Sequence, residues 1–236
     1  MKIYFLLIAA LLFINTGCRK DKVQKPACNI SQLTSPAGKK IKITYNAEGK
    51  YAKIENGETG ETSIPVYSPG AIIYTITNSS TSTLVRKITI ALNNSGMASS
   101  LKQEQYNAAG APTSLSNTVY EYNGTQLIKS TFSLPGSSST SINTYSWTNG
   151  NMTSSYNDIN ATDFEYYADK PVQQGDWISI INLINTGFDY TMIVKNKNLM
   201  KNYFGSLLSY RFDSEGKINA IYQDGTLLYN MEYECN

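Results

Sequence analysis

Apolar and polar side chains alternate with a period of two along most of this chain. Between residues 40 and 45, two Ile and a Tyr alternate with two Lys and a Thr. The same pattern recurs in the later segments Tyr120–Tyr122, Tyr210–Phe212 and Met231–Tyr233. Because successive side chains of a strand point to opposite faces, this alternation predicts β-strands with one packed face and one wetter face.

A loose repeat separates these strands: an aromatic residue or Leu, then one to three mostly small or polar residues, then Gly. Its copies are Tyr45–Gly49, Leu92–Gly96, Tyr106–Gly110, Tyr122–Gly124, Trp147–Gly150 and Phe212–Gly216. Asn-Gly or Asp-Gly pairs that begin at residues 56, 123, 149 and 224 tolerate the positive φ of short hairpin turns. The sequence therefore predicts an all-β fold, an antiparallel β-meander of repeated hairpins.

One segment departs from the two-residue period. Apolar residues at Trp177, Ile180, Ile181 and Ile184 recur at helical spacing. Asp176 before them is a suitable N-cap, and Gly187 after them is a suitable C-terminal stop. We expect a short helix near 176–186 that lies over the sheet, although the β-branched content also fits a buried strand.

The first residues have the layout of an export signal. Met1 and Lys2 precede an uncharged apolar run from Ile3 to Ile14, and small residues then lead to Cys18. The run of 12 residues spans about 18 Å as a helix, too short for a hydrocarbon core of roughly 30 Å. The junction resembles the lipobox of bacterial lipoproteins, although Asn15 stands where that motif usually has Leu. Residues 1–17 are thus predicted to be a lipoprotein signal peptide.

A lipobox implies that Cys18 becomes the mature N-terminus and carries a diacylglycerol and further acyl chains such as palmitate. Two or three acyl chains would hold the protein on a bilayer. Ordinary signal-peptidase cleavage elsewhere, or Cys18 as an incidental thiol, are the alternatives. We expect residues 18–37 to form a lipidated tether and residues 38–236 to form one β-hairpin-repeat domain, since an all-β chain of this size is commonly one domain.

Charge and histidine content narrow the function. With 20 basic and 18 acidic residues, the chain has a net charge of only +2, too little to hold a polyanion against salt, so nucleic acid is not an expected partner. The chain contains no histidine, which removes Ser-His-Asp and Cys-His catalytic sites and the commonest transition-metal ligand. No cofactor or metal is expected, because Asp158–Asn160 and Asp213–Gly216 lack the ligand count of a calcium loop and fit turns.

Two cysteines remain besides Cys18. Cys28 lies near the mature start and Cys235 lies next to the end of the chain, in a compartment that permits disulfides. They are the obvious pair, and a bond between them would restrict the unfolded chain by about 5 kcal/mol in the entropic model. Two unpaired thiols too far apart to bond are the alternative.

Carboxylates offer the remaining route to catalysis. Asp158, Asp163, Glu165 and Asp169 crowd one stretch, and alternation along a strand would place Asp163 and Glu165 on one face. A glycosidase needs two such carboxyls about 5 to 9.5 Å apart across a cleft. Solubilising charges at the end of a hairpin explain the cluster more simply, so we predict no enzyme activity.

Aromatic residues supply the other candidate site. The chain has 18 Tyr, and we expect their rings to pack on half-exposed strands while the hydroxyls stay wet. Trp147 and Trp177 could act as stacking platforms for a sugar ring, whereas core and cross-strand packing is the simpler reading.

The hairpin copies and their order resemble a family of Bacteroidota lipoproteins of unknown function with degenerate Rhs-like tyrosine-aspartate hairpin repeats. The resemblance covers roughly residues 38–235 and includes the order Phe164–Pro171, Asn198–Lys201 and Tyr210–Gly216 near the end. Asn46, Asn107 and Asn123 replace the Asp that usually follows the aromatic residue. This resemblance implies a curved, largely single-layer sheet, and it implies no activity.

The sequence as a whole predicts a lipid-anchored protein of the cell envelope, an outer-membrane lipoprotein that faces the cell surface or the periplasm. We expect a non-enzymatic binding or structural module whose partners are the membrane, through the lipid, and a glycan or envelope protein. A carboxylate-dependent enzyme that acts on extracellular polysaccharide is the alternative.

Overall fold

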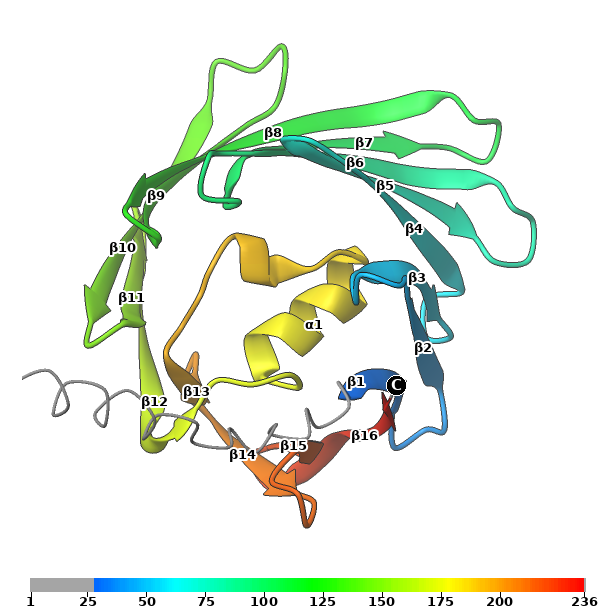
Figure 1. The fold of residues 1–236 in the computed structure, drawn as a ribbon. Coiled ribbons are helices and arrows are strands. Elements are labelled where there is room, and N and C mark those ends of the chain that lie inside the picture. The colour runs from blue at the N-terminus through cyan, green and yellow to red at the C-terminus, as the bar shows by residue number, and fades with distance from the viewer. Residues whose placement is uncertain (1–27, 236) are drawn as a thin grey trace, which may run out of the picture. The chain divides into compact units, whose positions relative to one another are not determined.

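The computed structural model describes residues 28–235, and these residues form sixteen strands, one α-helix and one short 3-10 helix. The predicted signal peptide and Cys18 lie outside the described residues. The compact body of the chain is Asn29–Glu234. Each strand pairs antiparallel with the next along the chain, and β1 lies beside β16, so the sheet closes into a barrel (Figure 1).

The strand boundaries follow the predicted hairpins. The first eight strands are β1 Cys28–Thr34, β2 Lys40–Tyr45, β3 Tyr51–Asn56, β4 Glu61–Ser68, β5 Ala71–Asn78, β6 Leu84–Leu92, β7 Ala98–Tyr106 and β8 Pro112–Asn123. The last eight are β9 Gln126–Ser133, β10 Thr140–Thr148, β11 Asn151–Asn157, β12 Ala161–Pro171, β13 Asn198–Tyr203, β14 Ser206–Phe212, β15 Ile218–Gln223 and β16 Thr226–Cys235.

Closure corrects two expectations. The all-β class and the antiparallel order of hairpins are confirmed, but the expected curved, largely single-layer sheet with free edges is wrong, because β1 and β16 close the ring. The tether expected to run to residue 37 also includes β1, which pairs with β2 from Gln32↔Lys42 to Thr34↔Lys40.

The inner face of the wall is apolar. Buried positions alternate along β5 at Ile72, Tyr74 and Ile76, and the register places Ile72 opposite Ile90 and Tyr74 opposite Ile88 of β6. Tyr74 contacts Phe188, which belongs to the segment inside the ring, with ring centroids 5.9 Å apart. The buried residues therefore point into the lumen, as the two-residue period requires.

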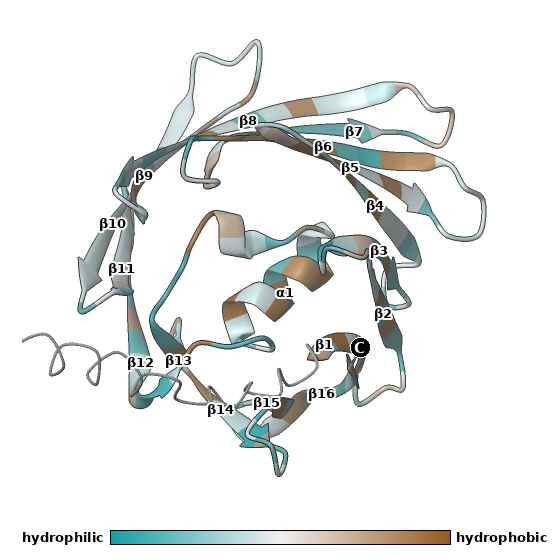
Figure 2. Ribbon diagram, viewed as in Figure 1, coloured by the Kyte–Doolittle hydropathy of each residue, from teal (hydrophilic) through white to brown (hydrophobic). Residues whose placement is uncertain are grey.

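Residues 172–197, between β12 and β13, form the segment that occupies the lumen, which we call the plug. It contains α1, Trp177–Thr186, and the 3-10 helix η2, Tyr190–Met192, and both lie within the ring of strands (Figures 1 and 2). Trp177, Ile178, Ile180, Leu183 and Ile184 of α1 are buried in one apolar cluster with the wall. The predicted helix is thus confirmed, but the sheet wraps around it instead of lying beneath it.

Both predicted ends of α1 are confirmed. Asp176 caps the first turn, where its carboxylate accepts hydrogen bonds from the backbone N–H of Ile178 at 3.0 Å and the hydroxyl of Ser179 at 2.8 Å. Gly187 ends the helix with φ +75°, and a Cβ there would lie 3.3 Å from Cβ of Ser63 in the wall. Its carbonyl also accepts a hydrogen bond from the Ser63 hydroxyl at 2.7 Å, so the helix end is fixed to β4.

Tyrosine hydroxyls join neighbouring strands, contrary to the expectation that they stay wet. In five cases a tyrosine of an even-numbered strand donates to a backbone carbonyl of the preceding strand. These pairs are Tyr45 with Ile30, Tyr67 with Tyr51, Tyr166 with Met152, Tyr210 with Met200 and Tyr233 with Ile218, at 2.7 to 3.1 Å. The rings thereby add apolar volume to the lumen while their hydroxyls remain hydrogen-bonded.

Cys28 and Cys235 form a disulfide in the structure, with their Cα atoms 3.9 Å apart. These residues begin β1 and end β16, and 207 positions separate them along the chain. The bond therefore closes nearly the whole chain into one loop.

We predict that replacing both Cys28 and Cys235 by Ser lowers the free energy of unfolding by about 2–5 kcal/mol, because the unfolded chain regains loop entropy. Urea denaturation measures the change, in a Cys18→Ala background so that no third thiol interferes. The unsubstituted pair treated with a reducing agent is the control and should match the double variant. If the reducing agent leaves the urea unfolding midpoint unchanged, the disulfide is not present.

Asp176 provides a second prediction. Burial raises the pKa of its carboxyl above the ordinary value of 3.8, although the hydrogen bonds from Ser179 and Ile178 oppose the shift. The folded state therefore favours the proton, so this carboxyl stabilises the fold most below the pKa of the unfolded chain. That contribution is lost as pH rises through the higher folded pKa.

The unfolding free energy of the wild type minus that of Asp176→Asn should accordingly fall as pH rises from below the unfolded pKa of about 3.8 through the higher folded pKa. Asn retains an oxygen that can cap the helix, so both proteins should fold. Urea denaturation at a series of pH values gives the difference, and groups common to both proteins cancel. A difference that grows as pH rises would show that the charged form is the stabilised one.

Candidate ligand-binding site

The two ends of the barrel differ. The strands run alternately up and down, so Asn29 and Glu234 lie at the same end of the barrel. Both ends of the plug lie at this end too, as do the hairpins at residues 46–50, 69–70, 93–97, 124–125 and 149–150. We call this the terminal end and the opposite one the distal end. Even-numbered strands finish at the terminal end, with an aromatic residue near the last position of most of them: Tyr45, Tyr67, Tyr122, Trp147, Phe212 and Tyr233.

The aromatic residues at the terminal end explain most of the sequence repeat. Five of its six copies, all but Tyr106–Gly110, place their turn at the terminal end. The aromatic residue of the copy precedes the turn and packs against the buried core, as Tyr45, Tyr122 and Trp147 do. The Tyr122 hydroxyl also donates to the carbonyl of Ile193 in the plug at 3.3 Å.

A cavity of about 390 Å³ lies at the terminal end between the plug and the wall. Four tyrosines line it, Tyr45 and Tyr51 from the β2–β3 hairpin and Tyr67 and Tyr74 from β4 and β5. The plug contributes Asp189, Thr191 and Lys195 to the same lining. We call this space the tyrosine cavity, and its size lies within the range of small-molecule sites.

The tyrosines of this cavity are held in place by hydrogen bonds. Tyr45 donates to the carbonyl of Ile30 at 3.0 Å, Tyr67 donates to the carbonyl of Tyr51 at 3.1 Å, and the backbone N–H of Asp189 donates to the Tyr74 hydroxyl at 3.4 Å. The rings therefore present fixed apolar faces and edges to whatever enters.

Electrostatics keep these phenols neutral. Burial raises the pKa of Tyr45 and Tyr51 well above the ordinary value of 10.0, and the Asp189 carboxylate acts in the same direction. Burial likewise raises the pKa of Tyr74. At physiological pH the cavity thus offers neutral hydroxyls and aromatic rings, not phenolate nucleophiles.

Two lysines contribute positive charge to the tyrosine cavity. Lys50 lies over the Tyr67 ring, with its Nζ 5.3 Å from the centroid, and Lys195 lies on the plug. Among residues 28–235, no carboxylate lies within 4.0 Å of either Nζ atom. The single carboxylate of the lining, Asp189, accepts a hydrogen bond from the backbone N–H of Thr191 at 2.9 Å.

A second cavity of about 330 Å³ adjoins the first within the plug. Its surface is mainly apolar, with Val172, Ile178 and Val194 among its lining residues. Gln174, Thr191 and Lys195 line both cavities and so mark the junction between them. We call this second space the plug cavity.

Trp147 and Trp177, the two residues predicted to stack on a sugar, pack against other residues of the barrel. Trp177 is 6% exposed and contacts Tyr203, with ring centroids 6.1 Å apart. Trp147 is half-buried against the core, and its Nε1 donates to the carbonyl of Leu127 at 2.6 Å. Both rings pack in the barrel, as the simpler reading of the sequence has it, and Trp177 has no exposed face on which a sugar could stack.

The predicted carboxylates lie on the outer wall. Asp163 and Glu165 share one face of β12, as the alternation implied, and both are exposed together with Asp158 and Asp169. Glu165 forms an ion pair with Lys201 of β13 at 3.1 Å. An open groove borders Asp163 and Glu165, and it does not bring two carboxyls together across an enclosed cleft.

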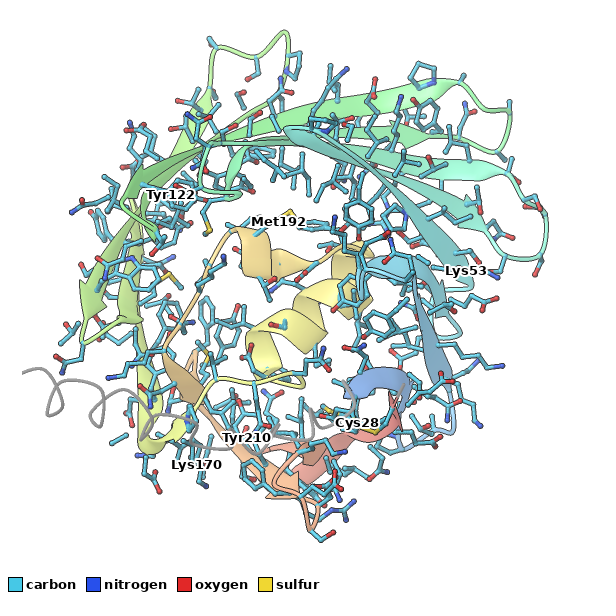
Figure 3. All side chains as sticks on the ribbon, in the orientation of Figure 1. Cys28, Lys53, Tyr122, Lys170, Met192 and Tyr210 are labelled. Carbon is cyan, nitrogen blue, oxygen red and sulfur yellow. A yellow bond between two sulfur atoms is a disulfide. The ribbon has the colours of Figure 1, made fainter. Side chains whose placement is uncertain are left out.

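The outer wall also carries charge in the middle of its strands. Lys53 pairs with Glu55 on β3 at 2.8 Å, and Lys102 pairs with Glu104 on β7 at 3.1 Å. Across β8 and β9, Glu121 and Lys129 are direct register partners and form an ion pair at 2.8 Å. Figure 3 shows Lys53 on the outer side of the wall and Met192 inside the ring.

Residues 28–235 lack both a membrane-spanning helix and a cluster of metal-binding side chains. No helix in this range is both long and apolar enough to cross a bilayer. No group of three or more Cys, Asp and Glu side chains is placed to hold a metal ion in the same range.

The residues of the tyrosine cavity were not singled out by the sequence. Tyr45 belongs to the repeat, which marks ring positions before terminal-end turns. Asp189 and Lys195 carry no comparable signal, because their role depends on the plug folding into the lumen.

Comparison with known proteins identifies the fold. No family model and no curated protein matches the chain. Among solved structures, a porin-like protein from Bacteroides uniformis ATCC 8492 matches with a TM-score of 0.57 and 11% identity, over 88% of this chain and 98% of that one. A porin-like protein from Bacteroides vulgatus ATCC 8482 matches with a TM-score of 0.53 and 15% identity, over the same shares. At this identity the likeness concerns the fold alone.

Proposed function

We propose that this protein is a non-enzymatic envelope lipoprotein whose barrel stands in water beside a membrane and binds a small molecule in the tyrosine cavity. The polarity of the barrel is the observation that supports this most directly. Apolar residues fill the lumen, whereas the outer wall carries ion pairs in the middle of several strands beside a few exposed apolar side chains such as Ile64, Val66 and Val119.

A barrel that crosses a membrane requires the opposite arrangement. Such barrels present an apolar band about 25 Å tall to the lipid and keep a polar interior. Lys102 and Lys129 lie in the middle of β7 and β9 on the outer face. A lysine at the midplane of a bilayer costs about 2–4 kcal/mol, so several of them on one wall favour contact with water.

The filled lumen argues against a channel. Ile178, Leu183 and Ile193 of the plug are buried in the same cluster as the inner face of the wall. A water-filled pore would need a polar path through this cluster. The similarity to porin-like proteins therefore supports an envelope location more than it supports conduction.

The membrane attachment in this proposal comes from the lipobox-like junction at Cys18. The resemblance to Bacteroidota lipoproteins agrees with it, and both similar structures come from Bacteroides. Two further points stay predictions from the sequence: that the protein faces the cell surface or the periplasm, and that its partner is a glycan or an envelope protein.

An enzyme that acts on polysaccharide through Asp163 and Glu165 has weaker support. Both carboxylates are exposed on an open wall, and Glu165 is neutralised by Lys201. General acid catalysis by a carboxyl needs a shielded site that raises its pKa. The purified protein should therefore turn over no polysaccharide.

We predict that Cys18→Ala either releases the protein from membranes or leaves its precursor uncleaved, because no acyl chain would then be attached at residue 18. Membrane fractions washed with sodium carbonate and probed for the protein measure this. Ser99→Ala, a change on β7 that leaves the signal intact, is the control and should stay bound.

The same proteins should give no conductance in planar bilayers at any voltage tested. A Cys18→Ala variant that is processed normally and still remains in carbonate-washed membranes, or stepwise conductance from the unsubstituted protein, would replace this proposal with a membrane-spanning barrel.

A further inference from the structure

We propose that the ligand is a single-chain amphiphile with an anionic head group, of the long-chain fatty acid class. This rests on the proposed function, because it assigns a ligand to the same cavity. The acyl chain would lie in the plug cavity and the carboxylate would lie at the junction with the tyrosine cavity.

The chemistry of the two cavities differs in the way an amphiphile requires. The plug cavity has a mainly apolar surface, supplied in part by Val172, Ile178 and Val194. The tyrosine cavity mixes aromatic rings with hydroxyls and charges. A ligand with one apolar part and one polar part satisfies both spaces, whereas a sugar would leave the apolar one without complementary groups.

Lys195 determines the charge of the head group. It lines both cavities and has no carboxylate within 4.0 Å among the described residues. Lys50 adds a second positive charge at the tyrosine cavity. Two carboxylates also line these spaces, Asp176 in the plug cavity and Asp189 in the tyrosine cavity, and each accepts hydrogen bonds from the backbone of the helix that it caps. The ammonium groups of Lys50 and Lys195 have no carboxylate within 4.0 Å among residues 28–235, so they are available to a carboxylate head group.

The position of the cavities is consistent with a nearby membrane as the source of this ligand. The hairpin residues Gly49 and Gly96 border the tyrosine cavity, so it lies at the terminal end. Gln174, at the junction, donates from Nε2 to Oδ1 of Asn29 at 2.9 Å, so the cavity borders the point where the chain enters β1. Cys18 precedes Asn29 by eleven residues, which span at most about 40 Å. A lipid on Cys18 would keep this end within reach of a bilayer.

Binding is tested on the full chain carrying Cys18→Ala, so that no detergent competes and the result does not depend on anchoring. Displacement of the fluorescent probe 11-(dansylamino)undecanoic acid by oleate or by oleyl alcohol measures the affinity. Both compounds should displace the probe, and oleate should bind more tightly. Failure of either compound to displace it, or failure of the probe itself to bind, overturns the proposal while leaving the anchoring test unaffected.

Two variants locate the ligand. Thr191→Trp fills the junction from an exposed position whose side chain makes no hydrogen bond among the described residues, and it should abolish probe binding. Lys195→Gln should weaken oleate by at least about tenfold, the effect of one charged hydrogen bond, and should leave oleyl alcohol unchanged.

Matched controls exclude general effects of charge and size. Lys197→Gln removes an exposed lysine two positions away that lines neither cavity, and Thr144→Trp adds a ring to the outer wall. Both should bind like the parent. Unchanged binding in Thr191→Trp, or equal losses in Lys195→Gln and Lys197→Gln, would place the ligand elsewhere and overturn the assignment. If Thr191→Trp does not fold, the Lys195→Gln comparison decides alone.

Discussion

A ring of sixteen strands encloses more space than its own side chains fill, and barrels of this size usually leave an aqueous channel. Here the plug enters the lumen as a helix and a 3-10 turn, and its apolar residues join the inner face of the wall in one buried cluster. The inward side chains can be aliphatic only because this segment excludes water from them. The outer face is then free to carry the ion pairs that face solvent, so the polarity of both faces follows from a filled interior.

The lumen is less completely filled at the terminal end, and both cavities lie there. Tyrosines near the ends of the even-numbered strands extend inward and attach their hydroxyls to the preceding strand, which gives a rigid and partly polar lining. Where the plug turns back past Asp189 and Lys195, it leaves space against these rings and within itself. The candidate site is therefore formed where two elements with separate packing requirements meet. Its aromatic part belongs to the wall, and most of its charge belongs to the plug.

Local features of the sequence predicted local features of the structure. Alternation around Ile41 and Ile43, the positive-φ turns at residues 124, 149–150 and 224–225, and the Asp176 and Gly187 helix ends are all read from neighbouring residues, and the structure has them. At the predicted Asn56-Gly57 turn, the positive φ lies instead at Gly60. Closure was not predictable in this way, because an open meander and a barrel have the same hairpins and differ only in whether β1 meets β16. The inward orientation of the tyrosines and the place of α1 in the lumen depend on that closure. Asp189 and Lys195 could not be recognised for the same reason, since the wall that completes their site comes from residues more than a hundred positions earlier.

The order of strands also determines how the chain can reach this fold. Nearly every pairing in the wall joins consecutive strands through a short turn, so these contacts have small sequence separation and form at low entropic cost. Two steps are different: β12 must find β13 across the plug, and β1 must find β16 across almost the entire chain. Closure is accordingly a single, late and cooperative event, and until it occurs two strand edges and the apolar face of the sheet are open to other chains. A chain of this design therefore exposes its two strand edges to association with other chains until its ring is complete.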